Sequence, residues 1–285
     1  MLLTPRLVFG PDALSARRGD GRYRVERLAS SNQTDLFVGP LLDARGLVKA
    51  FKGVRAVDAI DLRVNTGERV GLLGPNGAGK TTTLLMLLGA ITPDAGEIEI
   101  LGHRLPQQRS AAMGIVGFAA GYLRLPDRLK VSEALRLFAG LYGVDDERAA
   151  VADGLERFGI AHLGDKLCEQ LSSGQRTLVG ITKAILHRPR LLVLDEPTAS
   201  LDPDVALRVR DRLLDVCAAE GTTLLVTSHD MREVTMLCDR VVFLAGGRIV
   251  ADGAPTDIAE SFGHDDLEGV FLQLAGRALS EADEL

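Results

Sequence analysis

From residue 43 onward, short apolar runs alternate with segments of helical periodicity, a pattern typical of α/β proteins. The first expected strands, close enough to favour an antiparallel sheet, are 47–51, 54–58 and 60–64. A further strand at 69–73 leads into a glycine-rich turn and then a helix over 81–88 that ends at Gly89. Strand, turn and helix therefore follow one another in that order.

The pattern becomes helical between about residues 122 and 165, where Leu135, Phe138 and Leu141 or Tyr142 recur every three to four positions. This spacing predicts a helical insert in the α/β domain.

Buried strands are expected later in the chain. Residues 190–195 (RLLVLD) are apolar on both faces, as in a central parallel strand covered by helices. Asp202 and Pro203 supply an N-cap and a first-turn proline for the next helix. Another buried strand is expected at 222–227, and a hairpin over 240–251 around an Ala-Gly-Gly turn.

Composition narrows the class of protein. The 285 residues are 46% hydrophobic and 25% charged, with a net charge of −6, which suits a folded globular protein and disfavours one that neutralises nucleic-acid phosphates. The longest apolar run, at 84–91, is too short to span a bilayer. Cys168, Cys217 and Cys238 are widely spaced, which predicts buried thiols in a reducing compartment and not disulfides or a zinc site.

The segment GPNGAGKT, between an expected strand and an expected helix, fits the pattern of a phosphate-binding loop. Its glycines would let backbone N–H groups converge on an anion near the positive end of the helix. Lys80 would reach the β and γ phosphates, and the Thr81 hydroxyl would ligate Mg²⁺. The expected nucleotide contacts here are Gly74, Pro75, Asn76, Gly77, Ala78, Gly79, Lys80, Thr81 and Thr82. The alternative is a glycine-rich turn that matches by chance.

Two carboxylates, Asp195 and Glu196, end the buried strand at 190–195, on the edge where open α/β sheets bind ligands. Asp195 is expected to hold Mg²⁺ through water, and Glu196 to polarise an attacking water as general base. Pro197 favours an extended backbone at Glu196. Without the phosphate loop, such a pair would more often be a solvated strand end.

A second candidate anion site is LSSGQ at 171–175, where hydroxyls and a glycine open a helix expected over 176–186. Two phosphate sites in one chain suggest a head-to-tail dimer in which each subunit completes the site of the other.

Together these motifs resemble the nucleotide-binding domain of ABC transporters over about residues 43–257. The ordered elements are the phosphate loop, LSSGQ, the strand ending in Asp195-Glu196, the dimer-contact loop Ser200-Leu201-Asp202, and His229. The resemblance implies an α/β fold: a P-loop NTPase core with an antiparallel β subdomain and a helical subdomain at about 122–187. It places an N-terminal extension, expected to be poorly ordered, at 1–42 and a short tail at 258–285.

Further roles are implied by the resemblance alone. Ser173, where the commonest family form has Gly, and Gly174, in the same motif as Gln175, would contact the γ phosphate of ATP held by the opposite subunit. His229 would sense or stabilise that phosphate, joining Glu196 and Lys80 as a catalytic residue. Phe51 stands where the family stacks an aromatic ring on adenine, although a core phenylalanine is an equally simple interpretation.

The family also expects a glutamine at the end of the strand before the helical subdomain. The chain reads GIVGFAAGY there, and Ala119 is the nearest match by position. Because Lys80, Asp195, Glu196 and His229 are all present, ATP hydrolysis is still expected.

The family resemblance predicts an ATPase that uses ATP and Mg²⁺, works with separate permease subunits, and sits peripherally on the cytoplasmic face of the bacterial inner membrane without inserting into lipid. One complete motif set favours a homodimer, and the sequence at 266–276 resembles the C-terminus of exporter ATPases. The alternatives are a nonhydrolysing regulatory ABC subunit and a soluble ABC ATPase that acts on nucleic acid.

Overall fold

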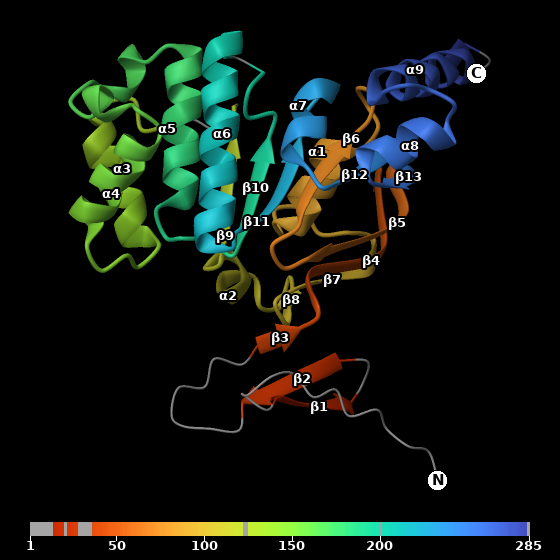
Figure 1. Cartoon of the computed structure of the whole chain (residues 1–285), viewed down its shortest axis with the longest axis horizontal. Helices are drawn as coiled ribbons and strands as arrows, with labels where there is room; N and C mark the ends of the chain where they lie inside the picture. Colours follow the sequence, from red (N-terminus) through yellow and green to blue (C-terminus); the bar gives the residue numbers. More distant parts are fainter. Residues whose placement is uncertain (1–13, 20–21, 28–35, 122–124, 200, 284–285) are drawn as a thin grey trace.

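A six-stranded sheet with the order β13-β12-β6-β11-β10-β9 forms the centre of the fold (Figure 1). Five of its strands run parallel, and only β13 is antiparallel to its neighbour β12. A four-stranded antiparallel sheet, β5-β4-β7-β8, and a three-stranded sheet, β1-β2-β3, are separate from it. The computed structural model describes residues 14–19, 22–27, 36–121, 125–199 and 201–283.

The strands are β1 Leu14–Gly19, β2 Arg22–Arg27, β3 Leu36–Val38, β4 Pro40–Phe51, β5 Val54–Asn65, β6 Arg69–Leu73, β7 Ala95–Ile100, β8 His103–Leu105, β9 Val116–Ala120, β10 Leu191–Asp195, β11 Thr223–Thr227, β12 Arg240–Ala245 and β13 Arg248–Gly253. The helices are α1 Lys80–Leu87, α2 Arg109–Met113, α3 Val131–Leu141, α4 Glu147–Arg157, η1 Ala161–Leu163, η2 Cys168–Gln170, α5 Ser173–Ile185, α6 Pro203–Glu220, α7 Met231–Leu237, α8 Pro255–Ser261 and α9 Leu267–Asp283. Within the described ranges, no helix has the length and apolar character needed to cross a bilayer.

The parallel strands confirm the sequence-based expectations. Every residue of β10 and of β11 is buried, because α5, α6 and α7 cover one face of the sheet, and α1 and the antiparallel sheet cover the other. The hairpin of β12 and β13 is also present. Its position next to β6 was not predictable from the local pattern, since strand order is decided by packing.

The antiparallel sheet is confirmed, but its strands are longer than expected. The segments 54–58 and 60–64 belong to one twelve-residue strand, β5, and 47–51 is the end of the twelve-residue strand β4. Shifts of pairing register interrupt their ladder, one of them between Ala44 and Leu47. Gly46 has φ +57°, so a bulge there bends β4 without ending it.

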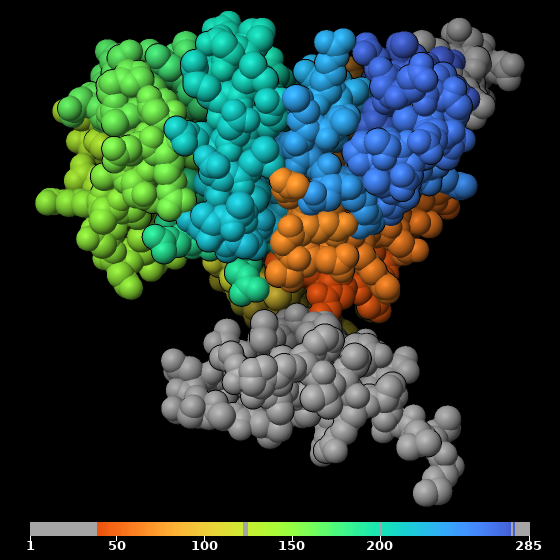
Figure 2. Space-filling view, in the orientation of Figure 1, coloured from red at the N-terminus to blue at the C-terminus, as the bar shows by residue number. Residues whose placement is uncertain are grey.

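The helical region consists mainly of α3, α4 and α5, which lie together on one side of the molecule, next to α6 (Figures 1 and 2). Leu135 is fully buried and Phe138 packs against the same core. The choice left open by the spacing falls on Tyr142, whose ring stacks on His187 with centroids 4.1 Å apart. Tyr142 is half-buried, whereas Leu141 is 73% exposed, so the packing selects Tyr142 from the two residues that the spacing allowed.

The two ends of the chain carry structure that the sequence pattern did not predict. Three short antiparallel strands, β1 to β3, occur within the first 42 residues, and β4 already begins at Pro40. At the other end, α8 and α9 pack against each other, and Leu267, Val270 and Leu274 join the main core. Apolar residues at helical spacing in α9 explain this packing.

The three cysteines are free and buried, as predicted. Burial raises the pKa of the Cys217 thiol to about 11 and shifts Cys168 and Cys238 in the same direction. Because the thiolate is the reactive form, iodoacetamide near neutral pH is expected to leave all three unmodified in the native protein and to label them after denaturation. Intact-mass measurement of both samples tests this, and rapid labelling of the native protein would contradict it.

Candidate functional site

The predicted catalytic segments meet because of the strand order. β11 lies between β6 and β10, and Thr227 pairs with Asp195 on one side and with Leu72 on the other. The loop after β6, the carboxylates after β10 and the turn after β11 therefore leave the sheet at the same edge (Figure 1).

The loop between β6 and α1 requires glycine at both of its ends. Gly74 and Gly79 have φ values of +145° and +100°, which other residues rarely adopt. A Cβ on Gly74 would lie 2.2 Å from the carbonyl oxygen of Leu244, and one on Gly79 would lie 2.3 Å from that of Ala56. The loop is thus packed closely against the ends of two other strands.

The remaining residues of the loop and of the first turn of α1 differ in exposure. Asn76 and Gly77 are exposed, and Ala78 is buried and donates its N–H to the carbonyl oxygen of Pro75 at 3.1 Å. Thr81 is exposed and Thr82 half-buried in the first turn of α1. Backbone N–H groups and hydroxyls are therefore presented at the positive end of this helix.

Lys80 is the first residue of α1, directly after the loop, and only 9% of its surface is exposed. Its Nζ donates to the carbonyl oxygens of Gly74 at 2.5 Å and Pro75 at 3.1 Å. Burial lowers its pKa, and the nearby carboxylates of Glu196 and Asp195 act in the opposite direction. The structure thus brings the ammonium group and the two carboxylates into one electrostatic cluster.

Asp195 is 8% exposed at the end of β10. Its Oδ1 accepts a hydrogen bond of 2.6 Å from the Thr227 hydroxyl. Burial raises the pKa of the carboxyl, and the charge on Glu196 adds to this effect, whereas the Thr227 hydrogen bond opposes it. A buried carboxylate with few partners is suited to bind a cation.

Glu196 does not have the extended backbone that Pro197 was expected to impose. Its φ is +50°, in the left-handed region that only glycine adopts readily. The Glu196 N–H donates to two atoms of Thr227, the carbonyl oxygen at 3.1 Å and Oγ1 at 3.0 Å. These two contacts explain why the local preference is overridden, and such strain is typical of functional positions.

His229 meets Glu196 at this edge. Its Nδ1 lies 3.5 Å from Oε2 of Glu196, and the two side chains are 61% and 39% exposed. A carboxylate and an imidazole are therefore side by side and open to solvent.

The LSSGQ segment forms the start of α5. Ser172 is the N-cap, and its hydroxyl accepts the N–H of Gln175 while the Gln175 side chain accepts the N–H of Ser172. Ser173 is exposed and Gly174 half-buried. In the ranges described, no side-chain hydrogen bond joins this segment to the phosphate loop. Of the predicted dimer-contact loop, Ser200 lies outside the described residues.

Phe51 is 46% exposed at the end of β4, so it is not the core residue that was its alternative interpretation. The ammonium of Lys49 lies 5.8 Å from its ring centroid. An exposed ring remains consistent with stacking on a base.

The strand β9 supplies no amide side chain. Ala119 pairs with Leu194 and is buried, so it is not the last residue of the strand. Ala120 ends the strand and pairs with Asp195, and Gly121 follows it. A strand-end residue near Asp195 thus carries no polar side chain here.

Four polar residues near the site were missed by the sequence analysis: Thr198, Thr227, Ser228 and Glu233. Their hydrogen bonds link the segments after β10 and β11. The only local signal was the position of Thr227 and Ser228 directly before His229.

Comparison with known proteins agrees with this geometry. Residues 57–199 match the family model described as ABC transporter. The chain belongs to the ABC transporter family. As an ABC ATPase, it is 38% identical over 222 residues to the Nod factor export ATP-binding protein I of Burkholderia orbicola (strain AU 1054), covering 77% of this chain and 73% of the relative. It is 37% identical over 231 residues to the lipopolysaccharide export system ATP-binding protein LptB of Escherichia coli (strain K12), covering 77% of this chain and 92% of the relative.

A solved structure described as the ATP binding subunit of an ABC transporter superimposes with a TM-score of 0.76 at 28% identity, covering 82% of this chain and 99% of that one. The chain is thus an ABC ATPase with the nucleotide-binding fold of that family.

Proposed function

We propose that this chain hydrolyses ATP to drive the export of a substrate through separate membrane subunits. The observation that carries the proposal is the convergence of Lys80, Asp195, Glu196 and His229 at one edge of the sheet. The direction of transport is supported by the relatives, two of which are named as export ATP-binding proteins.

In this mechanism, the loop at residues 74–79 binds the phosphates through backbone N–H groups, and Lys80 donates to the β and γ oxygens. Glu196 polarises a water molecule for attack on the γ phosphorus, and His229 donates to a γ-phosphate oxygen. The exposed ring of Phe51 stacks on the adenine.

The donor set near the loop fits Mg²⁺. Asp195 offers a carboxylate of which only Oδ1 is hydrogen-bonded, to Thr227, within the described residues, and Thr81 offers an exposed hydroxyl. Such oxygen donors are the ligands that Mg²⁺ prefers. When bound, the ion would neutralise charge on the phosphates.

The second half of each site comes from another copy of the chain. Ser173, Gly174 and Gln175 lie at the start of α5, where N–H groups and a hydroxyl suit a γ phosphate held by the opposite subunit. Because one chain carries every motif, a homodimer is sufficient.

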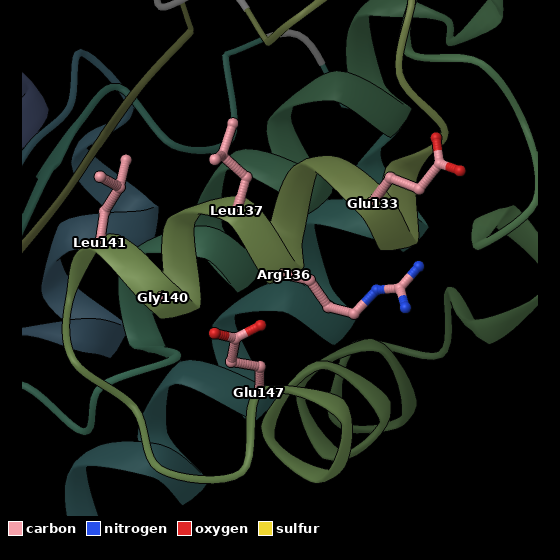
Figure 3. A pocket seen from close by; sticks show the side chains of 6 residues that line it. All are labelled: Glu133, Arg136, Leu137, Gly140, Leu141 and Glu147. Carbon is pink, nitrogen blue, oxygen red and sulfur yellow. The ribbon is translucent and has the colours of Figure 1, made fainter.

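The membrane partner docks on a surface that we define as the α3 patch: Glu133, Arg136, Leu137, Gly140, Leu141 and Glu147. They line an open depression of about 490 Å³ (Figure 3). Leu137 and Leu141, one turn apart on α3, are 49% and 73% exposed, and charges of both signs flank them. An apolar pair with a charged rim suits a short amphipathic segment of a membrane subunit. Docking there would hold the ATPase on the cytoplasmic face of the inner membrane.

Leu141→Glu tests this surface. We expect a reduction of about tenfold or more in recovery of a polytopic membrane protein with the tagged ATPase from native membranes, because a charge in the centre of an apolar contact weakens it. Recovery is quantified by mass spectrometry against the wild type.

The matched control is Leu272→Glu on α9, since Leu272 is 65% exposed and lies outside the α3 patch. Equal recovery with both variants would refute docking on this patch. Recovery of the wild type without any polytopic protein would count against the export function itself.

A further inference from the structure

Thr227 links the two catalytic carboxylates. Its hydroxyl donates to Oδ1 of Asp195 at 2.6 Å and accepts the N–H of Glu196 at 3.0 Å. Since Thr227 is fully buried, water cannot substitute for either contact. The end of β11 therefore fixes the end of β10.

The next residue, Ser228, turns its hydroxyl to a different partner. It donates to Oε2 of Glu233 at 2.7 Å and accepts the N–H of Asp230 at 3.0 Å. These contacts lie on both sides of His229 in the chain, so they fix the turn that carries the imidazole.

Glu233, on α7, also contacts the segment that follows Glu196. Its Oε1 accepts a hydrogen bond of 2.6 Å from the hydroxyl of Thr198. Only 8% of the surface of Glu233 is exposed, and each of its two carboxylate oxygens accepts a hydrogen bond from a hydroxyl. One hydroxyl belongs to the segment after β10 and the other to the segment after β11.

Helix capping does not account for this carboxylate. Asp230 is the N-cap of α7, and its Oδ1 accepts the N–H groups of Arg232 and Glu233. In the described ranges, Glu233 forms no salt bridge with a basic side chain that would offset its desolvation. Burying a carboxylate without a cationic partner costs free energy, which the hydrogen bonds from the two hydroxyls offset in part.

We propose that Glu233 is a positioning residue that joins the loop after Glu196 to the turn bearing His229. It thereby holds the Glu196 carboxylate and the His229 imidazole in a fixed arrangement relative to each other. The inference rests on the proposed roles of Glu196 and His229. Without the Thr198–Glu233–Ser228 bridge, only the hydrogen bonds of Thr227 tie Glu196 to the turn that bears His229 within the described ranges. The looser linkage weakens orientation of water and phosphate in the transition state.

Glu233→Gln tests the inference in the full-length protein with ATP and Mg²⁺. The amide keeps the shape but offers one acceptor oxygen in place of two, so one of the two hydroxyls loses the acceptor to which it donates. We expect kcat to fall about tenfold while KM for ATP changes less than about twofold, since the variant leaves the phosphate loop and Lys80, which provide most of the proposed phosphate binding, unchanged. The control is Glu220→Gln, a partly buried carboxylate at the end of α6 that pairs with Arg157.

Variants of Thr198 separate positioning from general loss of stability. Thr198→Val removes the hydroxyl at nearly constant volume and is expected to lower kcat about as much as Glu233→Gln, whereas Thr198→Ser keeps the hydroxyl and restores kcat. The double variant of Thr198→Val with Glu233→Gln is expected to lose no more than about the larger single loss, because both remove one contact.

The inference is overturned if wild-type protein hydrolyses ATP and Glu233→Gln has an unchanged kcat, if Glu220→Gln loses as much, or if Thr198→Ser is as slow as Thr198→Val. A wild-type protein with no ATP turnover overturns the proposed function and, with it, this inference. The two failures are therefore distinguished by the wild-type measurement alone.

Discussion

Glu196→Gln is expected to lower kcat for ATP hydrolysis by about 10²- to 10⁴-fold, because the amide cannot take a proton from the attacking water. The side chain is partly exposed beside His229, and the backbone N–H of residue 196 is held by Thr227, so an isosteric change leaves the local structure in place. Phosphate release measured at saturating ATP gives kcat, and equilibrium binding of a fluorescent ATP analogue gives affinity, which is expected to stay within about threefold.

The matched control for this variant is Glu156→Gln, an exposed carboxylate on α4. It is expected to behave as wild type. Turnover by Glu196→Gln at a measurable wild-type rate would show that another group is the base. Equally slow turnover by the wild type and by Glu196→Gln would indicate the alternative function, a nonhydrolysing regulatory subunit.

Lys80→Met is expected to weaken ATP binding by about 10- to 100-fold, since a hydrogen bond from a charged donor contributes about 1.5–3 kcal/mol. The ammonium is nearly buried, and its partners are the carbonyl oxygens of Gly74 and Pro75, so it lies inside the loop that would surround the phosphates. Methionine keeps the volume of the stem but removes the charge. Titration calorimetry with ATP and Mg²⁺ measures the loss.

Lys166→Met, at an exposed lysine, is the control for the loss of one positive charge. Thermal unfolding of both variants without nucleotide separates binding from folding. Wild-type affinity in Lys80→Met, with a folded protein, would contradict phosphate binding by this loop.

Local sequence was sufficient for much of the fold. The apolar run before Asp195 predicted β10, and the run before the glycine-rich loop predicted β6 with the bounds that the structure has. The local pattern failed where one strand contains a bulge. It predicted two short strands in place of β5, because Ala59, with φ +55°, interrupts the pattern without ending the strand. The spacing left Leu141 and Tyr142 as alternatives, and only the packing of Tyr142 against His187 decides between them.

The sequence itself determined the chemical groups of the site, since these groups depend on residue type and local spacing. They are a loop with obligatory glycines, a lysine, two carboxylates at the end of a buried strand, and a histidine after another strand. The tertiary structure decided how they work together. Strand order places β11 between β6 and β10, and the hydrogen bonds that the Glu196 N–H donates to Thr227 hold Glu196 in a left-handed backbone against the preference set by Pro197. The contact of Thr198 with Glu233 spans 35 positions, and His229 reaches Glu196 across a similar separation. Such contacts depend on which strands pair, a long-range outcome of burying both faces of the sheet that no local pattern encodes.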